Sequence, residues 1–263
     1  MTIPRLLIVA GSDCGGGAGI QADIKTASAF GVYAMTAITA VTVQNTLGVS
    51  GWHPVPPQTV RGQIEACLTD IGADAVKTGM LGDAAMVETV ADALKDISAP
   101  LVVDPVMVAK GGAKLLADAA VAAIRARLLP LATLVTPNLP ECEALIGAAP
   151  ATQDEARAAA RKFHALGVRH VLFKGGHAAG PLVRDMLADG ESGAVLVLEA
   201  PRIDTLHTHG TGCTLASAIA CGLAQKRPLA EAVGRAHAYV QAAIRTAPGL
   251  GAGHGPLNHF VRP

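Results

Sequence analysis

The chain has 263 residues, of which 51% are hydrophobic and 3% aromatic, so it can bury one large core built mainly from Ala, Val, Leu and Ile. Lys and Arg together number 21, as do Asp and Glu, and this balance argues against a nucleic-acid partner or an anionic membrane surface. Apolar runs fall well short of the ~20 residues of a membrane span, and the N-terminal residues lack a small-residue cleavage site. We therefore expect no membrane partner and no signal peptide.

The number and spacing of the cysteines indicate the cellular compartment. The chain has five cysteines, an odd number, and no two have the spacing of metal ligands. Reduced thiols are typical of a cytoplasmic protein, and we expect that location.

Apolar segments typical of strands alternate along the chain with Ala-rich segments typical of helices. In chain order, strands are predicted over 5–10, 32–43, 73–77, 101–103, 133–136 and 170–174. Helices are predicted over 18–30, 58–71, 83–95, 114–128, 140–146, 152–165, 212–225 and 229–246. Residues 183–198 resemble a hairpin that turns at Asp189-Gly190, which suits an antiparallel edge. This order predicts an α/β fold with a mainly parallel sheet covered on both faces, in a single domain over 1–263.

Polar or glycine-rich segments follow the predicted strands. Ligands of such sheets bind beyond the carboxyl ends of the strands. The segments that fall there are 11–19, 44–45, 79–80, 104, 138–141 and 174–177. Because they meet on one rim of the sheet, we expect the active site there.

Gly210-Thr211-Gly212-Cys213 opens an apolar helix. The glycines let backbone N–H groups converge, and the helix dipole adds positive potential, so the segment can form an anion hole for a transferring phosphoryl group. An ordinary loop-to-helix turn is the alternative. Cys213 lies in the first turn, a position that lowers a thiol pKa, so it could act as a base or contact a substrate hydroxyl. The alternative is a small buried residue.

The loop at 11–19 superficially matches a dinucleotide-binding fingerprint through Gly17, Gly19 and Ala22. The loop is too long for the tight turn of that motif, and the second strand leads to Gln44 rather than to an acidic residue. The chain also contains no Walker A sequence. The sequence therefore argues against a dinucleotide-dependent oxidoreductase. If the chain binds ATP, a segment other than a Walker A loop must hold the phosphates.

Two residues are candidates for recognising a substrate ring. Asp23 lies one turn into the first helix, where it faces the rim or the solvent, and on the rim it could bind an exocyclic amine. Gln44 could pair with an amidine edge, because its amide both donates and accepts. The alternatives are a solvated surface acid and a turn-forming Gln-Asn.

Acidic and basic residues at three strand ends are candidates for phosphate chemistry. Asp104 and Glu141 could hold Mg²⁺ through water, although Glu141 could simply cap its helix. Lys174 offers a point charge to phosphate, or is a solvated side chain beside a glycine turn. The histidines lack a zinc spacing, so most are expected to be structural: His207, His209, His254 and His259.

Together these segments resemble the ribokinase-like superfamily, and within it the hydroxymethylpyrimidine/phosphomethylpyrimidine kinases of bacterial thiamine biosynthesis. The segments that carry the resemblance are 11–23, 39–45, 77–81, 104–112, 136–141, 174–177, 208–214 and 253–260. Each is weak alone, but their order over nearly the whole chain is specific. Two residues depart from the family's pattern: Cys14 stands where Ser is expected, and His237 where Lys is expected. If that Lys steadies the substrate phosphate, the second reaction is the one affected.

The resemblance implies a three-layer α/β/α fold, a homodimer and an ATP- and Mg²⁺-dependent kinase. It implies two reactions, in which an aminopyrimidine alcohol becomes a monophosphate and then a diphosphate. The implied pyrimidine pocket comprises Gly11, Asp23, Gln44, Met80 and Val106. The implied catalytic and phosphate-facing residues are Gly210, Thr211, Gly212 and Cys213 at the anion hole, Asp104 and Glu141 for the metal, and Asn138 and Lys174 for the nucleotide.

Two other functions remain open from the sequence. A pyridoxal or pyridoxine kinase shares the family pattern, and Cys213 does not decide between them, because a thiol could also form a hemithioacetal with the pyridoxal aldehyde. A non-catalytic ligand-binding regulator could keep the fold, but Asp104, Glu141, Lys174 and Cys213 argue against it. ATP turnover separates an enzyme from a regulator.

Overall fold

The computed structural model describes residues 2–107, 118–178 and 180–263. Within them, nine strands form one sheet in the order β3-β2-β1-β4-β5-β6-β7-β8-β9. The strands are β1 (Arg5–Asp13), β2 (Tyr33–Asn45), β3 (Gly48–Pro54), β4 (Ala75–Thr78), β5 (Leu101–Val103), β6 (Leu134–Val135), β7 (His170–Phe173), β8 (Leu182–Asp189) and β9 (Val195–Pro201). The six neighbouring strands β2-β1-β4-β5-β6-β7 pair in parallel. At one edge β3 pairs antiparallel with β2, and at the other β8 pairs antiparallel with both β7 and β9.

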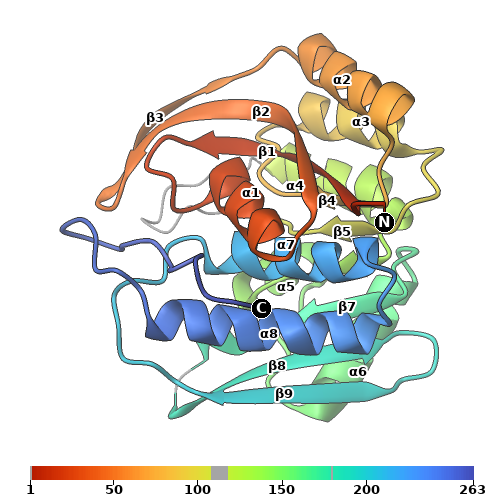
Figure 1. Cartoon of the computed structure of the whole chain (residues 1–263). Coiled ribbons are helices and arrows are strands. Elements are labelled where there is room, and N and C mark those ends of the chain that lie inside the picture. The colour runs from red at the N-terminus through yellow and green to blue at the C-terminus, as the bar shows by residue number, and fades with distance from the viewer. Residues whose placement is uncertain (1, 108–117, 179) are drawn as a thin grey trace.

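Helices cover both faces of this sheet and make three layers (Figure 1). One face packs against α1 (Gly19–Ala29), α7 (Thr211–Ala224) and α8 (Leu229–Arg245). The other packs against α2 (Pro57–Ala66), α3 (Ala84–Leu94), α4 (Asp118–Ala123), α5 (Leu139–Ile146) and α6 (Gln153–His164). None of the described helices is long and apolar enough to cross a membrane.

The central strand β1 shows why its sequence is almost wholly apolar. Leu6 and Ile8 belong to the core under α1, α7 and α8, whereas Leu7 and Val9 belong to the core on the opposite face. All four side chains are fully buried. Alternate residues of a strand point to opposite faces, so a strand covered on both sides needs apolar residues at every position.

The predicted elements agree with the structure except near irregular backbone. The strand β3 was not predicted; its Gly48 and Gly51 disfavour a strand by propensity, but pairing with β2 holds it. The helix predicted over 58–71 ends as α-helix at Ala66 and continues as a π-helical turn over Cys67–Ile71. The helix predicted over 114–128 is seen as α4 followed by a second π-helical turn, Ile124–Leu128, while 114–117 lies outside the described residues. So does the 108–112 part of the motif at 104–112.

Candidate active site

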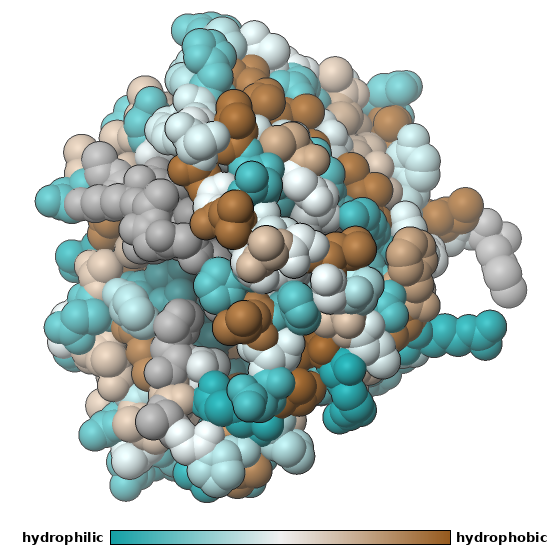
Figure 2. All heavy atoms as spheres, turned by 90° about the vertical axis from the view of Figure 1, so that its left-hand side faces the viewer, coloured by the Kyte–Doolittle hydropathy of each residue, from teal (hydrophilic) through white to brown (hydrophobic). Residues whose placement is uncertain are grey.

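A cavity of about 1050 Å³ lies beyond the carboxyl ends of the parallel strands. Figure 2 looks onto this end of the molecule, where the surface is hollowed. All predicted site residues except Asp23 line the cavity: Gly11, Gln44, Met80, Asp104, Val106, Asn138, Glu141, Lys174, Gly210, Thr211, Gly212 and Cys213. The fold therefore brings together segments that are more than 200 residues apart in the chain.

One end of the cavity has an apolar wall with the amide of Gln44 beside it. Met80 is buried and packs with Ala40 and Val106 in a small cluster of its own. A Cβ on Gly11 would lie 3.2 Å from the Met80 sulfur, so glycine keeps this wall open. Gln44 is half-buried at the end of β2. This end suits a flat, methyl-bearing ring with a polar edge.

The helix α7 begins beside the opposite, charged end. Gly210 has a φ of 81°, and a Cβ there would lie 1.8 Å from the Gly17 carbonyl oxygen, so only glycine fits. Thr211 N–H donates to Thr208 O, and Thr214 N–H donates to Gly210 O. The N–H groups of Gly212 and Cys213 have no intrahelical partner, as is general in a first turn. They are the donors of the predicted anion hole.

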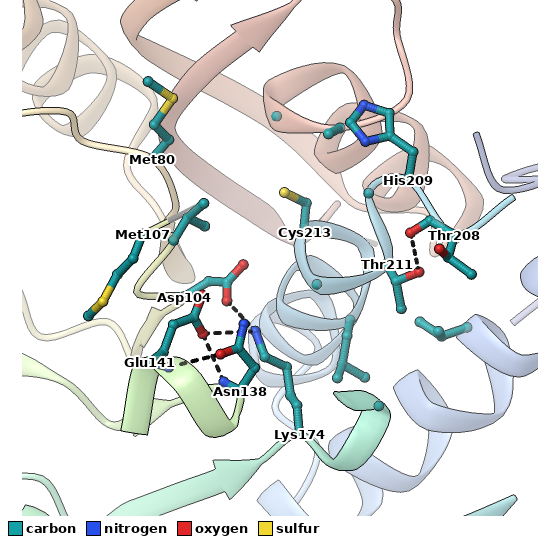
Figure 3. Close-up of a pocket in the computed structure, with 18 of the residues that line it drawn as sticks. Met80, Asp104, Met107, Asn138, Glu141, Lys174, Thr208, His209, Thr211 and Cys213 are labelled. Carbon is teal, nitrogen blue, oxygen red and sulfur yellow. Dashed lines mark hydrogen bonds and ion pairs between the residues drawn. The ribbon is translucent and has the colours of Figure 1, made fainter. Parts of the chain in front are cut away.

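A buried ion cluster faces this helix start. Lys174 Nζ lies 2.8 Å from Asp104 Oδ1 and 3.6 Å from Glu141 Oε2. A Cβ on Gly212 would lie 3.4 Å from the same Nζ, which places the cluster beside the first turn of α7 (Figure 3). Burial disfavours the charged Lys174, but the carboxylates of Asp104 and Glu141 outweigh it and raise the Lys174 pKa. Burial also raises the pKa of Glu141, and Lys174 opposes that effect.

Asn138 and Glu141 also form a capping box at the start of α5. The Asn138 side chain accepts from Glu141 N–H at 2.9 Å, and the Glu141 carboxylate accepts from Asn138 N–H at 2.8 Å. The capping alternative for Glu141 is thus present in the structure. The capping box does not rule out metal binding by Glu141, since this side chain also faces Lys174 and lines the cavity.

The sequence-based expectation for the Cys213 thiol is wrong. A helix N-terminus favours a thiolate, but burial has the larger effect here and raises the Cys213 pKa to about 11, although Lys77 opposes it. In Figure 3 the side chain points into the cavity between Met80 and His209. At neutral pH Cys213 is therefore a neutral thiol placed to contact a ligand.

The placement expected for Asp23 is also wrong. Its side chain is fully buried, reaching neither the rim nor the solvent, and it does not line the cavity. Lys77 Nζ lies 2.8 Å from Asp23 Oδ2, and Ser217 donates to Oδ1 at 2.7 Å. The position of Asp23 on α1 directs its side chain toward the sheet. There Lys77 of β4 supplies the opposite charge that a buried carboxylate needs.

Comparison with known proteins identifies the family. A family model described as Phosphomethylpyrimidine kinase matches residues 13–258. The chain belongs to the phosphomethylpyrimidine kinase family. It is 51% identical to the hydroxymethylpyrimidine/phosphomethylpyrimidine kinase of Streptomyces coelicolor, over 98% of this chain and 95% of that one.

Two further relatives show how widely the family's fold is used. The chain is 53% identical to the thiamine biosynthesis bifunctional protein ThiED of Geobacter sulfurreducens, with 97% of this chain matching 52% of that protein, about half its length. The structure of the Staphylococcus aureus pyridoxal kinase in complex with AMP-PCP and pyridoxal aligns with a TM-score of 0.88 at 34% identity, over 98% of this chain and 94% of that one. Phosphomethylpyrimidine and pyridoxal kinases thus share this architecture.

The donor set of this phosphomethylpyrimidine kinase family member fits a hydrated magnesium ion. No group of three or more His, Cys, Asp or Glu side chains in the described residues is arranged to hold a metal alone. Mg²⁺, however, keeps several waters and binds through one or two carboxylates together with substrate phosphates. Asp104 and Glu141 supply two such carboxylates at the charged end of the cavity.

Several cavity residues were missed by the sequence reasoning. Asp13 closes the glycine loop by accepting from backbone N–H groups, and His209, which was expected to be structural, reaches both Asp13 and Gln44. Their signals were present in the sequence: an acid just before a glycine run, and a histidine just before Gly210. His237, the departure from the family pattern, lines the cavity with Nε2 3.9 Å from Asp185 Oδ2.

Proposed function

We propose that this chain phosphorylates 4-amino-5-hydroxymethyl-2-methylpyrimidine to its monophosphate and then to the diphosphate, in thiamine biosynthesis. The observation that carries the proposal is one cavity that joins the Gln44 amide and its apolar wall to the anion hole and Lys174. A ring at the apolar end would present its hydroxymethyl group toward Gly210–Cys213. The family and its curated relatives support the same activity.

ATP is the proposed phosphoryl donor. Phosphoryl transfer needs positioning and charge stabilisation more than covalent chemistry. Lys174 and the N–H groups of Gly212 and Cys213 would donate hydrogen bonds to the phosphates, and Asn138 lines the same region. The relative from Staphylococcus aureus, which binds AMP-PCP, supports a nucleotide at this cavity. Magnesium, held by Asp104 and Glu141, would neutralise phosphate charge.

A comparison of kcat/KM between two alcohol substrates tests the proposed function. We expect the hydroxymethyl aminopyrimidine to be phosphorylated with a higher kcat/KM than pyridoxal, because Gln44 offers a donor and an acceptor to an amidine edge that pyridoxal lacks. Product formation from ATP would be measured for both alcohols and for the pyrimidine monophosphate. Equal or reversed values of kcat/KM would favour the pyridoxal kinase function, and absence of ATP turnover with every acceptor would favour a regulator.

The metal role of the two acids can be separated from their structural roles. Asp104→Asn keeps the shape of the side chain, and Glu141→Gln keeps the capping box, because glutamine also serves at that position. We expect each variant to lower kcat by roughly 10²-fold or more and to need more Mg²⁺ for half-maximal turnover. Asp104→Asn should also lower the thermal midpoint, because Lys174 loses its nearer counter-charge. Wild-type magnesium titrations for both variants would show that these acids serve only the cap and the Lys174 pair.

We also propose a homodimer that acts in the cytoplasm, with each chain folding as one domain. Apolar side chains are exposed on the β2-β3 ribbon: Val41 is 51%, Val43 63% and Leu47 72% exposed. Exposed apolar side chains gathered on one antiparallel ribbon favour a protein contact, and a second copy would cover them. Sedimentation equilibrium should give twice the mass of the chain. A monomeric mass at micromolar concentration would exclude the dimer.

A further inference from the structure

Three polar side chains, those of Asp13, His209 and Gln44, follow one another along the wall of the cavity. His209 Nε2 lies 2.9 Å from Asp13 Oδ2 and 3.2 Å from the amide nitrogen of Gln44. Asp13 and His209 are buried, with 2% and 7% of their surface exposed. The imidazole ring is also tightly packed, since a Cβ on Gly17 would lie 2.5 Å from His209 Cδ2. The Gly17 backbone therefore packs directly against the His209 ring.

Asp13 determines where the His209 ring carries a proton. Its Oδ1 accepts from Gly15 N–H at 2.8 Å, and its Oδ2 accepts from Gly17 and Ala18 N–H at 3.0 and 2.8 Å. Burial favours a raised Asp13 pKa, but the hydrogen bonds from His209, Ala18 and Gly15 lower it below its ordinary value. An ionised carboxylate only accepts hydrogen bonds, so His209 Nε2 must carry a hydrogen and act as a donor.

This donor settles the orientation of the Gln44 amide. The amide nitrogen and Nε2 of His209 would be two donors facing each other, which is unfavourable. Turning the amide by 180° gives every group a partner. The single hydrogen on His209 Nε2 is then shared between two acceptors, Asp13 Oδ2 at 2.9 Å and Gln44 Oε1 at 3.2 Å. Gln44 Nε2 donates to the Thr42 hydroxyl, which lies 3.2 Å from the amide and donates its own hydrogen to Ser12 O at 2.9 Å.

We propose that His209 is a positioning residue that holds the Gln44 amide in one orientation and so sets the order of donor and acceptor offered to the substrate ring. Gln44 keeps one N–H on the Thr42 side and one oxygen lone pair on the His209 side for a ligand. An amidine edge matches this order when its ring nitrogen faces Thr42 and its exocyclic amine faces His209. This inference rests on the proposed function, because it concerns recognition of the aminopyrimidine.

A double-mutant cycle tests the coupling between His209 and Gln44. His209→Met removes the donor at similar length, Gln44→Leu removes the amide, and a third chain carries both changes. We expect each single change to lower kcat/KM for the aminopyrimidine alcohol by about 10- to 100-fold, because each leaves polar groups unpaired. The double variant should be no worse than the poorer single variant, and KM for ATP should change less than about twofold.

Three comparisons distinguish positioning from a general structural role. His209→Gln restores an N–H donor and should recover most of the lost kcat/KM, whereas His207→Met, on the same loop but outside the cavity lining, should behave like wild type. The desamino pyrimidine alcohol keeps only the ring-nitrogen contact to Gln44, so its kcat/KM should fall less than that of the aminopyrimidine alcohol when His209 is replaced by Met. Losses that multiply in the double variant, or an equal loss with the desamino compound, would overturn the proposal.

A measurement on the unaltered chain covers the case in which His209→Met does not fold. Long-range proton–nitrogen NMR of the ring at pH 8.5, where an unperturbed imidazole is neutral, should show the hydrogen on Nε2. A hydrogen on Nδ1 alone would overturn the proposal. If the wild-type chain fails to phosphorylate the aminopyrimidine at all, the proposed function fails instead, and the NMR result still tests whether His209 Nε2 is a donor.

Discussion

Replacing Lys77 with methionine is expected to lower the free energy of unfolding by about 3–5 kcal/mol, because it strands the buried carboxylate of Asp23 without its counter-charge. Both side chains are fully buried, and the Nζ–Oδ2 distance is 2.8 Å. Burial raises the Asp23 pKa, while Lys77 and Ser217 oppose that rise, so the ionised form depends on these partners. Urea unfolding followed by far-UV circular dichroism gives the difference.

The matched control removes both charges. A chain with Lys77→Met and Asp23→Leu should regain most of the lost stability, since a buried ion pair replaced by apolar groups of similar size is often near neutral. If the two changes are simply additive, the pair is not coupled. A stable Asp23→Leu chain with only a raised KM for the alcohol would instead restore the interpretation of Asp23 as a substrate contact.

The largest effect on turnover is expected at Gly212 rather than at Cys213. A methyl group on Gly212 would enter the space beside Lys174 Nζ and Asp104 Oδ2, at 3.4 and 3.6 Å. We expect Gly212→Ala to lower kcat by up to about 10²-fold, a loss comparable to that of one anion-hole donor, because the N–H remains but the methyl group holds the transferring phosphoryl group away from it. Its thermal midpoint should not fall, because alanine favours a helix more than glycine does.

Cys213→Ala distinguishes the two mechanisms. With a thiol pKa of about 11, little thiolate exists at neutral pH, so we expect this variant to stay within about tenfold of wild type, well short of the ~10²–10⁴-fold that a general base contributes. Rates with saturating ATP and aminopyrimidine, measured for both variants, decide the matter. A Cys213→Ala chain that loses 10²-fold or more while binding the alcohol normally would identify the thiol as the base.

Much of the site followed from the sequence because parallel strands end at one edge. Once 101–103 and 170–174 are recognised as strands, Asp104 and Lys174 must come to the same rim, and they form an ion pair there. The side-chain direction of Asp23 could not be obtained in this way. It depends on the helical turn that faces β4, and on a buried partner 54 residues away.

The missed features share a physical cause. β3 is held by pairing with β2 rather than by its own composition, and tertiary contacts override strand propensity. Cys213 is half-buried in the cavity wall, and this burial raises its thiol pKa, an effect that the first-turn position alone does not give. His209 looked like a structural histidine because its two partners, Asp13 and Gln44, lie 196 and 165 residues away in the chain.

The charged end of the cavity is assembled from both helical layers. Gly212 begins α7, which packs on one face of the sheet, whereas Glu141 begins α5, which packs on the other. The sheet separates the two cores, so the packing of each helix start is determined by a different core. The relative orientation of the N-termini of α5 and α7 is therefore sensitive to substitutions that are far from any ligand. Repacking Leu145 or Ile219 should alter phosphoryl transfer through alignment alone, which makes deep core positions a route by which evolution can tune the rate of this enzyme.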